Sequence, residues 1–503
     1  MRHTTLAALL LPLLLALPHQ ASQAQTPAPE NFEDQTALPK DASLAPIQAI
    51  LATINTHKPE AVRDFLEKYT TPEFQKRFPF DAHLEFFLGL WQSTTGLDWY
   101  ALRTFPSQTA TPDKRVLILK DRLYGGWHAI EMELTNDPKP LIKKFRLTRA
   151  LPPQGKTQLL ANEQAMLDQA KKLVQKGCEK QVFSGSAMIA HGNKVILSMA
   201  CGEASKRYHV KNNIDTKFNL GSMNKRFTAV SIAQLVEQGK LSYDDKISKY
   251  IDDTWLPKEI TDQITVHHLL SHTSGLGSYF NETYDKSSRD LFVELNDYKP
   301  LVKDDKLQFP PGSNYAYSNT GMLLLGVVIE KASAQNYFDY VRKNVSQPAG
   351  MKNSDCYPLD EPVENLAMGY FPDFSGGAPW LENTFKHVLR GGPAGGGYAT
   401  SPDLLRFAQA LQAGKLVKPA TLATLWQDHS KHGYGYGFVI RPTPAGRVIG
   451  HSGGFTGLNS QLDMFVDQGF TVAVMANHDG AASPLANSLG LLIQRLPALK
   501  AKP

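Results

Sequence analysis

The sequence predicts an α+β protein with an antiparallel sheet that encloses a mostly helical insert, preceded by a smaller α+β unit. Two β-rich runs, at residues 182–190 and 194–201, are joined by a plausible hairpin turn. A long helical middle follows and is broken by clusters of glycine and proline. Because strand-like runs return near the C-terminus, we expect the first and last strands of the sheet to be distant in sequence. These late runs cover residues 434–440, 447–449, 461–466 and 471–476, and a terminal helix covers 485–496.

The N-terminus has the pattern of a secretory signal peptide. A short basic start precedes a Leu-rich run to Leu17, and small residues follow at Ala21, Ser22 and Ala24. The apolar run is too short and too interrupted by proline to span a bilayer. We expect a signal peptide over residues 1–24, cleaved after Ala24, and a periplasmic or secreted product. Residues 25–45 are rich in Pro, Ala and Gln, which is typical of a tether.

Residues 46–150 are expected to form a small accessory domain. Helical spacing over residues 46–77 and 83–91 precedes four strand-like runs, at residues 98–106, 114–122, 127–135 and 141–148. Helices followed by strands indicate an α+β unit, and the order vaguely resembles the NTF2-like domains. No catalytic constellation lies in it, so a docking or scaffold module is the expected role. A Pro- and Gly-containing linker then leads to the main domain, at residues 160–500.

Composition excludes several classes of function. The net charge is only +5, and no block of consecutive Lys or Arg is present, so a nucleic-acid partner is not indicated. No later apolar run is long enough to span a membrane, so we expect no transmembrane segment in the mature chain. Three cysteines, Cys178, Cys201 and Cys356, permit at most one disulfide and show no metal-ligand spacing. His268 and His272 are four residues apart, but no carboxylate pattern accompanies them, and no metal is expected.

Ser222 is the candidate nucleophile, and Lys225 is its candidate base. They open an amphipathic helix expected from Arg226 to about Gly239, which would place them on one face. A serine hydroxyl needs a neighbouring base, and a buried lysine with a lowered pKa can serve. A chain of this length is expected to hold roughly one or two Ser-x-x-Lys matches by chance, so the motif has weight only in context.

Two further elements supply that context. Tyr317 and Asn319 lie on a loop after a Pro-Pro-Gly turn and before an apolar helix, where a phenol could relay a proton and an amide could hold Lys225 or the substrate. A similar Tyr-x-Asn at Tyr279 lacks this approach. His451, Ser452, Gly453 and Gly454 follow a strand signal, and the glycines permit close approach of a substrate backbone. The amides of Ser222 and Gly454 could form an oxyanion hole.

These three elements, in this order, resemble the serine β-lactamase and penicillin-binding superfamily. The branch that holds class C β-lactamases, D-alanyl-D-alanine carboxypeptidases, D-amino-acid amidases and esterases is the most similar. The phrases at residues 264–276 and 395–404 look like the same branch, and the likeness covers about residues 160–497. The resemblance implies a sheet with flanking helices and a helical lobe (a β-lactamase-like transpeptidase fold), an acyl-enzyme intermediate, and neither metal nor other cofactor.

The resemblance also implies roles for individual residues. Ser222 would be the nucleophile, Lys225 its base and Tyr317 an acid/base, while Asn319, His451, Ser452 and Gly453 would contact the substrate. His451 stands where β-lactamases carry lysine; an imidazole, with an ordinary pKa of ~6.5, is largely neutral at pH 7. We therefore expect a small ester, amide or peptide substrate. Alternatives are a true class C-like β-lactamase and a penicillin- or peptidoglycan-binding protein without turnover. Residues 391–397 are interpreted as a turn into a helix over 402–411.

Overall fold

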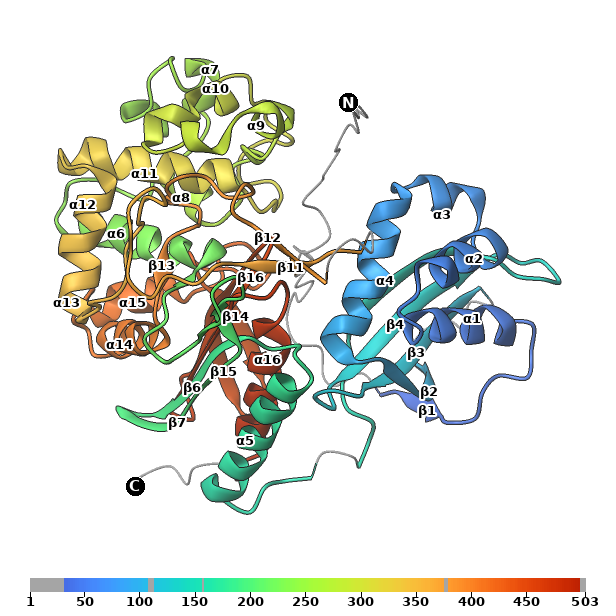
Figure 1. Ribbon diagram of the computed structural model, residues 1–503. Coiled ribbons are helices and arrows are strands. Elements are labelled where there is room, and N and C mark those ends of the chain that lie inside the picture. The colour runs from blue at the N-terminus through green and yellow to red at the C-terminus, as the bar shows by residue number, and fades with distance from the viewer. Residues whose placement is uncertain (1–30, 107–112, 156–157, 375–378, 498–503) are drawn as a thin grey trace. The chain divides into compact units, whose positions relative to one another are not determined.

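The computed structural model describes residues 31–106, 113–155, 158–374 and 379–497 (Figure 1). These residues divide into two units by their internal contacts. The larger holds residues 183–371 and 381–486, and the smaller holds the other described residues. The expected signal peptide, at residues 1–24, and the first residues of the expected tether lie outside the described part.

The smaller unit contains the helices and strands that the sequence predicts for residues 46–150. Its sheet has the order β1-β2-β3-β4-β5, and every neighbouring pair is antiparallel. Apolar side chains of the helices, such as Ile47, Ile50 and Phe65, share a core with Leu117 and Ile130 of the sheet. The helices are α1 (Leu44–Ile54), α2 (Pro59–Tyr69), α3 (Pro72–Lys76), α4 (Phe80–Thr94) and α5 (Glu163–Glu179), and the strands are β1 (Glu33–Gln35), β2 (Leu97–Thr104), β3 (Lys114–Asp121), β4 (Trp127–Leu134) and β5 (Ile142–Arg149).

Part of the segment expected to be a tether is ordered structure. Residues 33–35 form the edge strand β1, which pairs with β2. Asp34 makes a 2.7 Å ion pair with the buried Arg103, and the Arg103 guanidinium lies 3.6 Å from the ring centroid of Phe32. The expectation of an unstructured tether over all of 25–45 is therefore wrong for this stretch, because a partner distant in sequence fixes it.

The larger unit is built on a six-stranded antiparallel sheet with the order β14-β15-β16-β17-β6-β7. The prediction that early and late strands meet is confirmed, since β17 pairs with β6 in a register that sets Val472 opposite Ile189. The strands are β6 (Gly185–His191), β7 (Lys194–Cys201), β14 (Val439–Thr443), β15 (Gly446–Phe455), β16 (Leu458–Phe465) and β17 (Phe470–Ala476).

A helical lobe is inserted between β7 and β14, and its helices α6, α8, α11 and α12 lie together above the sheet in Figure 1. Helix α14 instead packs against β6 and β17. The longer helices are α6 (Lys225–Glu237), α11 (Asn319–Ser333), α14 (Ser401–Gln412), α15 (Pro419–Leu425) and α16 (Ala482–Gln494). Short helices are α7 (Lys258–Thr261), α8 (Val266–Leu270), α9 (Glu282–Lys286), α10 (Lys299–Val302), α12 (Tyr337–Val341) and α13 (Gln347–Ala349). Short strands are β8 (Glu203–Ser205), β9 (Val210–Lys211), β10 (Phe218–Asn219), β11 (Tyr370–Pro372), β12 (Trp380–Glu382) and β13 (Tyr398–Ala399).

One local expectation is wrong. The strand expected over 434–440 begins only at Val439, because Asp428 accepts hydrogen bonds from the amides of Ser430 and Gly433 and holds the preceding residues in a turn. Helix α8 ends at Leu270, and His272 has a left-handed φ of 58°, so His268 and His272 do not share a helix face.

The three cysteines are in two different bonding states. Cys178 and Cys201 are disulfide-bonded, whereas Cys356 is a buried free thiol. Among the residues that the structure describes, none of the helices has both the length and the apolar character needed to cross a bilayer.

Candidate active site

Ser222 lies in the 3-10 turn η1 (Gly221–Asn224), which runs directly into α6. Gly221, which precedes it, has a φ of 50°, and a Cβ at this position would lie 2.9 Å from the Gly454 amide nitrogen. Glycine is therefore required twice, for the backbone conformation and for the close approach of β15. The turn differs from the expected first α-helical turn, but it still presents Ser222 beside Lys225.

Lys225 is fully buried, and its Nζ contacts three oxygens. They are the Ser222 hydroxyl at 3.0 Å, Asn319 Oδ1 at 2.9 Å and the Ala394 carbonyl. Burial lowers the pKa of Lys225 well below the ordinary value of 10.5. The environment therefore favours the neutral amine, which is the form that can accept a proton.

The three contacts suit a neutral amine. A carbonyl and a side-chain amide oxygen accept hydrogen bonds only, so Asn319 and Ala394 each take one N–H of Lys225. A neutral amine that uses its two N–H groups in this way has its lone pair left for the remaining partner, the Ser222 hydroxyl at 3.0 Å. The arrangement orients the amine as a base toward one proton.

Tyr317 and Asn319 lie on either side of the N-terminus of α11. Ser318 caps this helix by accepting a hydrogen bond from the Gly321 amide at 2.8 Å, which places Asn319 at the first helical position. Asn319 Nδ2 donates to the Ser278 hydroxyl at 3.1 Å, which fixes the orientation of its amide toward Lys225.

The Tyr317 ring centroid lies 4.8 Å from Lys225 Nζ. Tyr317 as a whole is 37% exposed, but desolvation of its phenol raises the pKa of Tyr317 above its ordinary value, and a hydrogen bond with Ser222 opposes that shift. Tyr317 is therefore a protonated phenol near neutral pH, suited to donating a proton.

The second Tyr-x-Asn pattern has a structural role. Asn281 caps the short helix α9, accepting from the Tyr284 amide at 3.0 Å and donating to the Leu301 carbonyl at 2.8 Å. Tyr279 is buried among other aromatic rings. The choice of Tyr317 over Tyr279 agrees with this placement.

Strand β15 brings the third element to the nucleophile. A Cβ on Gly453 would lie 1.9 Å from the Leu220 carbonyl oxygen, so only glycine allows the strand to pack against the turn that holds Ser222. β14 pairs with β15 only as far as Gly450, and residues 451–455 continue beyond it. This open edge places the Gly454 amide beside the turn of Ser222, as a two-donor oxyanion site requires.

His451 is buried and has defined hydrogen-bond partners. Its Nδ1 lies 2.5 Å from the Ser452 carbonyl oxygen, and its Nε2 lies 3.0 Å from the Tyr434 hydroxyl. Its ring centroid is 6.4 Å from that of Tyr317. The sequence therefore identified a histidine near the proposed proton donor, but it did not indicate Tyr434.

The glycine-rich segment 391–397 precedes α14, as expected, and it also forms hydrogen bonds with the turn that holds Ser222. Gly397 accepts from the Leu220 amide at 2.7 Å, and the Gly396 amide donates to the Gly221 carbonyl at 3.2 Å. Asn224 donates to the Gly392 carbonyl and accepts from the Gly397 amide, both at 3.2 Å. The segment thus encloses the turn that holds Ser222 and supplies the Ala394 carbonyl to Lys225.

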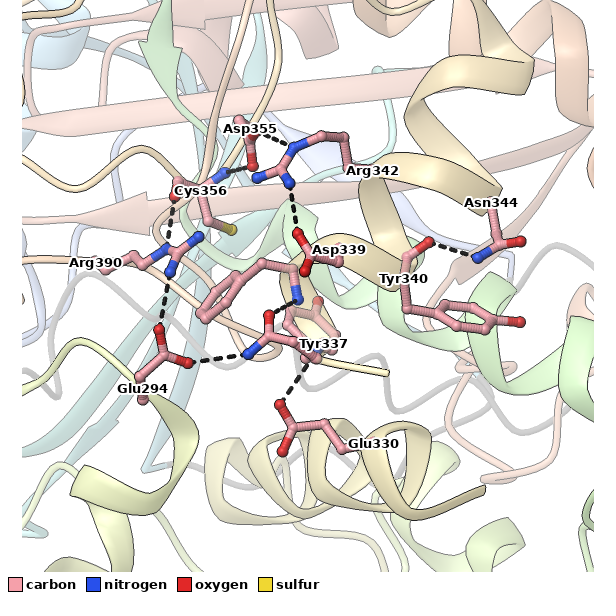
Figure 2. Close-up of polar contacts among 12 residues, drawn as sticks. Glu294, Glu330, Tyr337, Asp339, Tyr340, Arg342, Asn344, Asp355, Cys356 and Arg390 are labelled. Carbon is pink, nitrogen blue, oxygen red and sulfur yellow. Dashed lines mark hydrogen bonds and ion pairs between the residues drawn. The ribbon is translucent and has the colours of Figure 1, made fainter. Parts of the chain in front are cut away.

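Arg390 anchors this segment at its start (Figure 2). Its Nε donates to the Cys356 carbonyl at 3.0 Å, and its Nη1 forms a 3.0 Å ion pair with Glu294. The guanidinium also lies 3.6 Å from the ring centroid of Phe338. Contacts to three separate parts of the lobe fix the point from which residues 391–397 extend.

Sequence reasoning missed three contributors, namely the Ala394 carbonyl, Ser278 and Tyr434. A backbone carbonyl has no side-chain signature, and only the density of glycine in 391–397 indicated a close backbone approach. His272, which was dismissed as a metal ligand, accepts a hydrogen bond from the Ser318 amide at 3.1 Å and packs its ring 4.4 Å from that of Tyr317. Among the described residues, no cluster of three or more His, Cys, Asp or Glu could hold a metal ion.

Comparisons with known proteins agree with this geometry. The family model described as Beta-lactamase matches residues 162–494. Penicillin-binding protein 4* of Bacillus subtilis is 31% identical over 60% of this chain and 69% of its own length. Esterase EstB of Burkholderia gladioli is 26% identical over 66% of this chain and 94% of its own length. The crystal structure of a penicillin-binding protein from Bacillus halodurans aligns with a TM-score of 0.58 and 29% identity, over 67% of this chain and 99% of that one.

Proposed function

The chain belongs to the beta-lactamase family and is a serine hydrolase, and we propose that it is exported and cleaves an ester or amide through an acyl-enzyme on Ser222. The observation that carries the proposal is Lys225: it is fully buried, and its Nζ lies 3.0 Å from the Ser222 hydroxyl. A buried lysine confined among neutral acceptors is costly as a cation, which favours its use as a base.

Acylation begins with the proton of Ser222. Lys225 Nζ accepts it while Ser222 Oγ attacks the carbonyl carbon of the substrate. The negative charge on the carbonyl oxygen is stabilised by the amides of Ser222 and Gly454. Tyr317 donates its phenolic proton to the leaving oxygen or nitrogen as the bond breaks, and it recovers a proton from the Lys225 ammonium through Ser222 Oγ or water. The products are an acyl-Ser222 ester and a free alcohol or amine.

Deacylation uses the same groups in the reverse order. A water molecule attacks the acyl-Ser222 carbonyl carbon and gives its proton to the base formed by Tyr317 and Lys225. Ser222 Oγ leaves and takes that proton, which releases the carboxylic acid and restores the free enzyme. Asn319 holds Lys225 through Oδ1 in both steps.

We expect an ester, amide or small peptide as the substrate rather than a β-lactam. His451 occupies the position at which β-lactamases carry lysine, and its two nitrogens contact a carbonyl and a tyrosine hydroxyl. A neutral imidazole attracts a substrate carboxylate less than an ammonium does. The name of the relative esterase EstB is consistent with ester cleavage.

The other parts of the chain complete the proposal. Residues 1–24 would direct export and be removed, and residues 160–500 would form the catalytic domain. Residues 46–150, for which the structure gives a closed apolar core, would serve as a docking or scaffold module. The product would be periplasmic or secreted, without a cofactor.

Active-site labelling tests the proposal. The mature protein and its Ser222→Ala variant are treated with a fluorophosphonate probe and with fluorescent penicillin. They are then assayed on p-nitrophenyl esters, D-amino-acid amides, D-Ala-D-Ala peptides and a chromogenic cephalosporin. We expect labelling and ester or amide turnover that Ser222→Ala abolishes.

The other outcomes contradict parts of the proposal. Labelling by penicillin without turnover of any substrate would indicate a binding protein. Rapid hydrolysis of the cephalosporin would indicate a class C-like β-lactamase and remove the argument from His451. Activity that survives Ser222→Ala would refute the assignment of the nucleophile.

A further inference from the structure

Tyr434, which belongs to none of the three motifs found in the sequence, contacts several residues of the candidate site. Its ring lies 4.6 Å from that of His272, 6.3 Å from that of Tyr317 and 5.8 Å from that of His451. Its hydroxyl lies 3.0 Å from His451 Nε2, and the residue is 3% exposed. A buried tyrosine hydroxyl needs a hydrogen-bond partner, and here that partner is His451 on β15.

The hydrogen bonds of His451 with Ser452 and Tyr434 specify one tautomer. A backbone carbonyl accepts only, so the Ser452 contact places a proton on Nδ1. Burial raises the pKa of Tyr434 well above 10, so its phenol keeps its proton and can donate it toward Nε2. A neutral His451 thus uses both contacts. Protonating Nε2 would make that nitrogen a donor and would leave the buried Tyr434 hydrogen in need of another acceptor.

The charged groups around His451 act in the same direction. Lys225 and His451 both act on the buried His272, whose pKa each of them lowers as a cation, so a charge on His451 would add to positive charge in the same buried cluster. His272 is buried, accepts at Nδ1 from the Ser318 amide, and has a pKa well below its ordinary value because of burial. The Tyr317 ring also faces the imidazole, with the two ring centroids 6.4 Å apart.

The carboxylate of Asp463 on the neighbouring strand does not offset this repulsion. It stands opposite Gly450, while His451 stands opposite Leu462, so the two side chains project from different faces of the sheet. Asp463 is bound instead by Arg441 and Gln461.

We propose that Tyr434 is a positioning residue that holds His451 as a neutral imidazole protonated on Nδ1, and thereby favours substrates whose leaving group carries no carboxylate. The inference rests on the proposed hydrolase function and specifies the substrate class of the same site. Without the Tyr434 hydroxyl, protonation of Nε2 no longer leaves a buried hydroxyl hydrogen in need of an acceptor, so the site gains a cation more readily as the pH falls.

A pair of matched esters measures this effect. Meta-carboxyphenyl phenylacetate and meta-carbamoylphenyl phenylacetate share the acyl group and the scissile bond, and they differ in one leaving-group charge. The ratio of kcat/KM for the anionic over the neutral ester is measured from about pH 5.5 to about pH 8. Dividing each variant's ratio by that of the wild-type protein cancels the intrinsic reactivity of the esters.

We expect a wild-type ratio below one that changes little with pH. In Tyr434→Phe the ratio should rise roughly twofold to fivefold toward the acidic end, the effect of a partly solvated charge pair. His451→Lys should raise the ratio at every pH, because the cation is then permanent. Tyr315→Phe is the matched control: its ring packs 6.4 Å from that of Tyr434, and its ratio should follow the wild type.

Several results overturn the inference. They are a wild-type preference for the anionic ester, a Tyr434→Phe ratio that follows the wild type, and a His451→Lys ratio that does not rise. Should Tyr434→Phe fail to fold, NMR of wild-type protein with ¹⁵N-labelled histidine decides, with His451→Gln assigning the signal. We expect one protonated nitrogen, Nδ1, and a bare Nε2; two protonated nitrogens at neutral pH overturn the inference.

The Ser222→Ala variant separates this inference from the proposed function. If it still hydrolyses both esters, the hydrolase mechanism fails. If it is inactive while the Tyr434→Phe ratio stays flat, only the role of Tyr434 fails.

Discussion

Gly453→Ala should separate the strand that carries Gly454, the proposed oxyanion donor, from the turn that carries Ser222, the proposed nucleophile. The added Cβ would lie 1.9 Å from the Leu220 carbonyl oxygen and 2.7 Å from Ser460 Oγ. Ordinary contact begins at 3.4 Å, so the backbones must part by about 1.5 Å (3.4 − 1.9). The carbonyl has little freedom to yield, because Ser460 Oγ donates to it at 2.7 Å.

This displacement predicts a large decrease in kcat/KM and a small decrease in Tm. A misplacement of about 1 Å costs roughly 10²-fold in rate, and loss of one oxyanion donor costs about 10²–10³-fold. We expect kcat/KM to fall by about 10²–10³. Overpacking costs about 1–3 kcal/mol of stability, a Tm decrease of several degrees, so the variant should still fold.

The assay is steady-state hydrolysis of an activated ester, with Tm measured by differential scanning calorimetry. Gly392→Ala is the control, because its added Cβ would approach nothing closer than Leu295 Cδ2, at 3.9 Å. We expect this control to retain activity within about threefold. Wild-type kcat/KM in Gly453→Ala, with the protein folded, would refute the assignment of the Gly454 amide to the oxyanion site.

Three further predictions follow from the same structure. Lys225→Met removes the proposed base and should lower kcat/KM by about 10²–10⁴ without loss of fold by circular dichroism; a decrease smaller than tenfold would contradict the assignment. Burial lowers the pKa of His268 from its ordinary value of 6.5 to about 4. Between these two pH values the unfolded protein takes up a proton on His268 that the folded protein does not, so the free energy of unfolding should fall as the pH drops from 6.5 toward 4. His268→Gln, which keeps an acceptor for the Thr265 amide, should weaken the pH dependence of the free energy of unfolding measured by urea titration, and an unchanged dependence would exclude this histidine. Arg390→Met should lower stability by about 1–3 kcal/mol and lower kcat/KM as well, through the segment that holds Ala394; normal activity at reduced Tm would show that the anchor is structural only.

The sequence by itself determined the order of helices and strands, the antiparallel sheet and the main chemical groups. Helical and strand periodicities are local, and Ser222, Lys225, Tyr317 and His451 stand in motifs that can be read over a few residues. The structure brings Lys225 Nζ within 3.0 Å of Ser222 Oγ and within 2.9 Å of Asn319, which is 94 positions away in the sequence. The order of the motifs predicted which residues would be partners, but it could not predict the distances between their atoms.

Tertiary structure alone decided which groups complete the site. The Ala394 carbonyl reaches Lys225 because residues 391–397 wrap around the nucleophile's turn, and a carbonyl has the same chemistry in every sequence. The local sequence around Tyr434 predicts a strand, but hydrogen bonds to Asp428 hold the preceding residues in a turn. The Tyr434 hydroxyl then lies next to His451. β1 likewise forms because Asp34 meets Arg103 across 69 positions. Contacts of this kind depend on how distant segments pack, and local propensity carries no information about that.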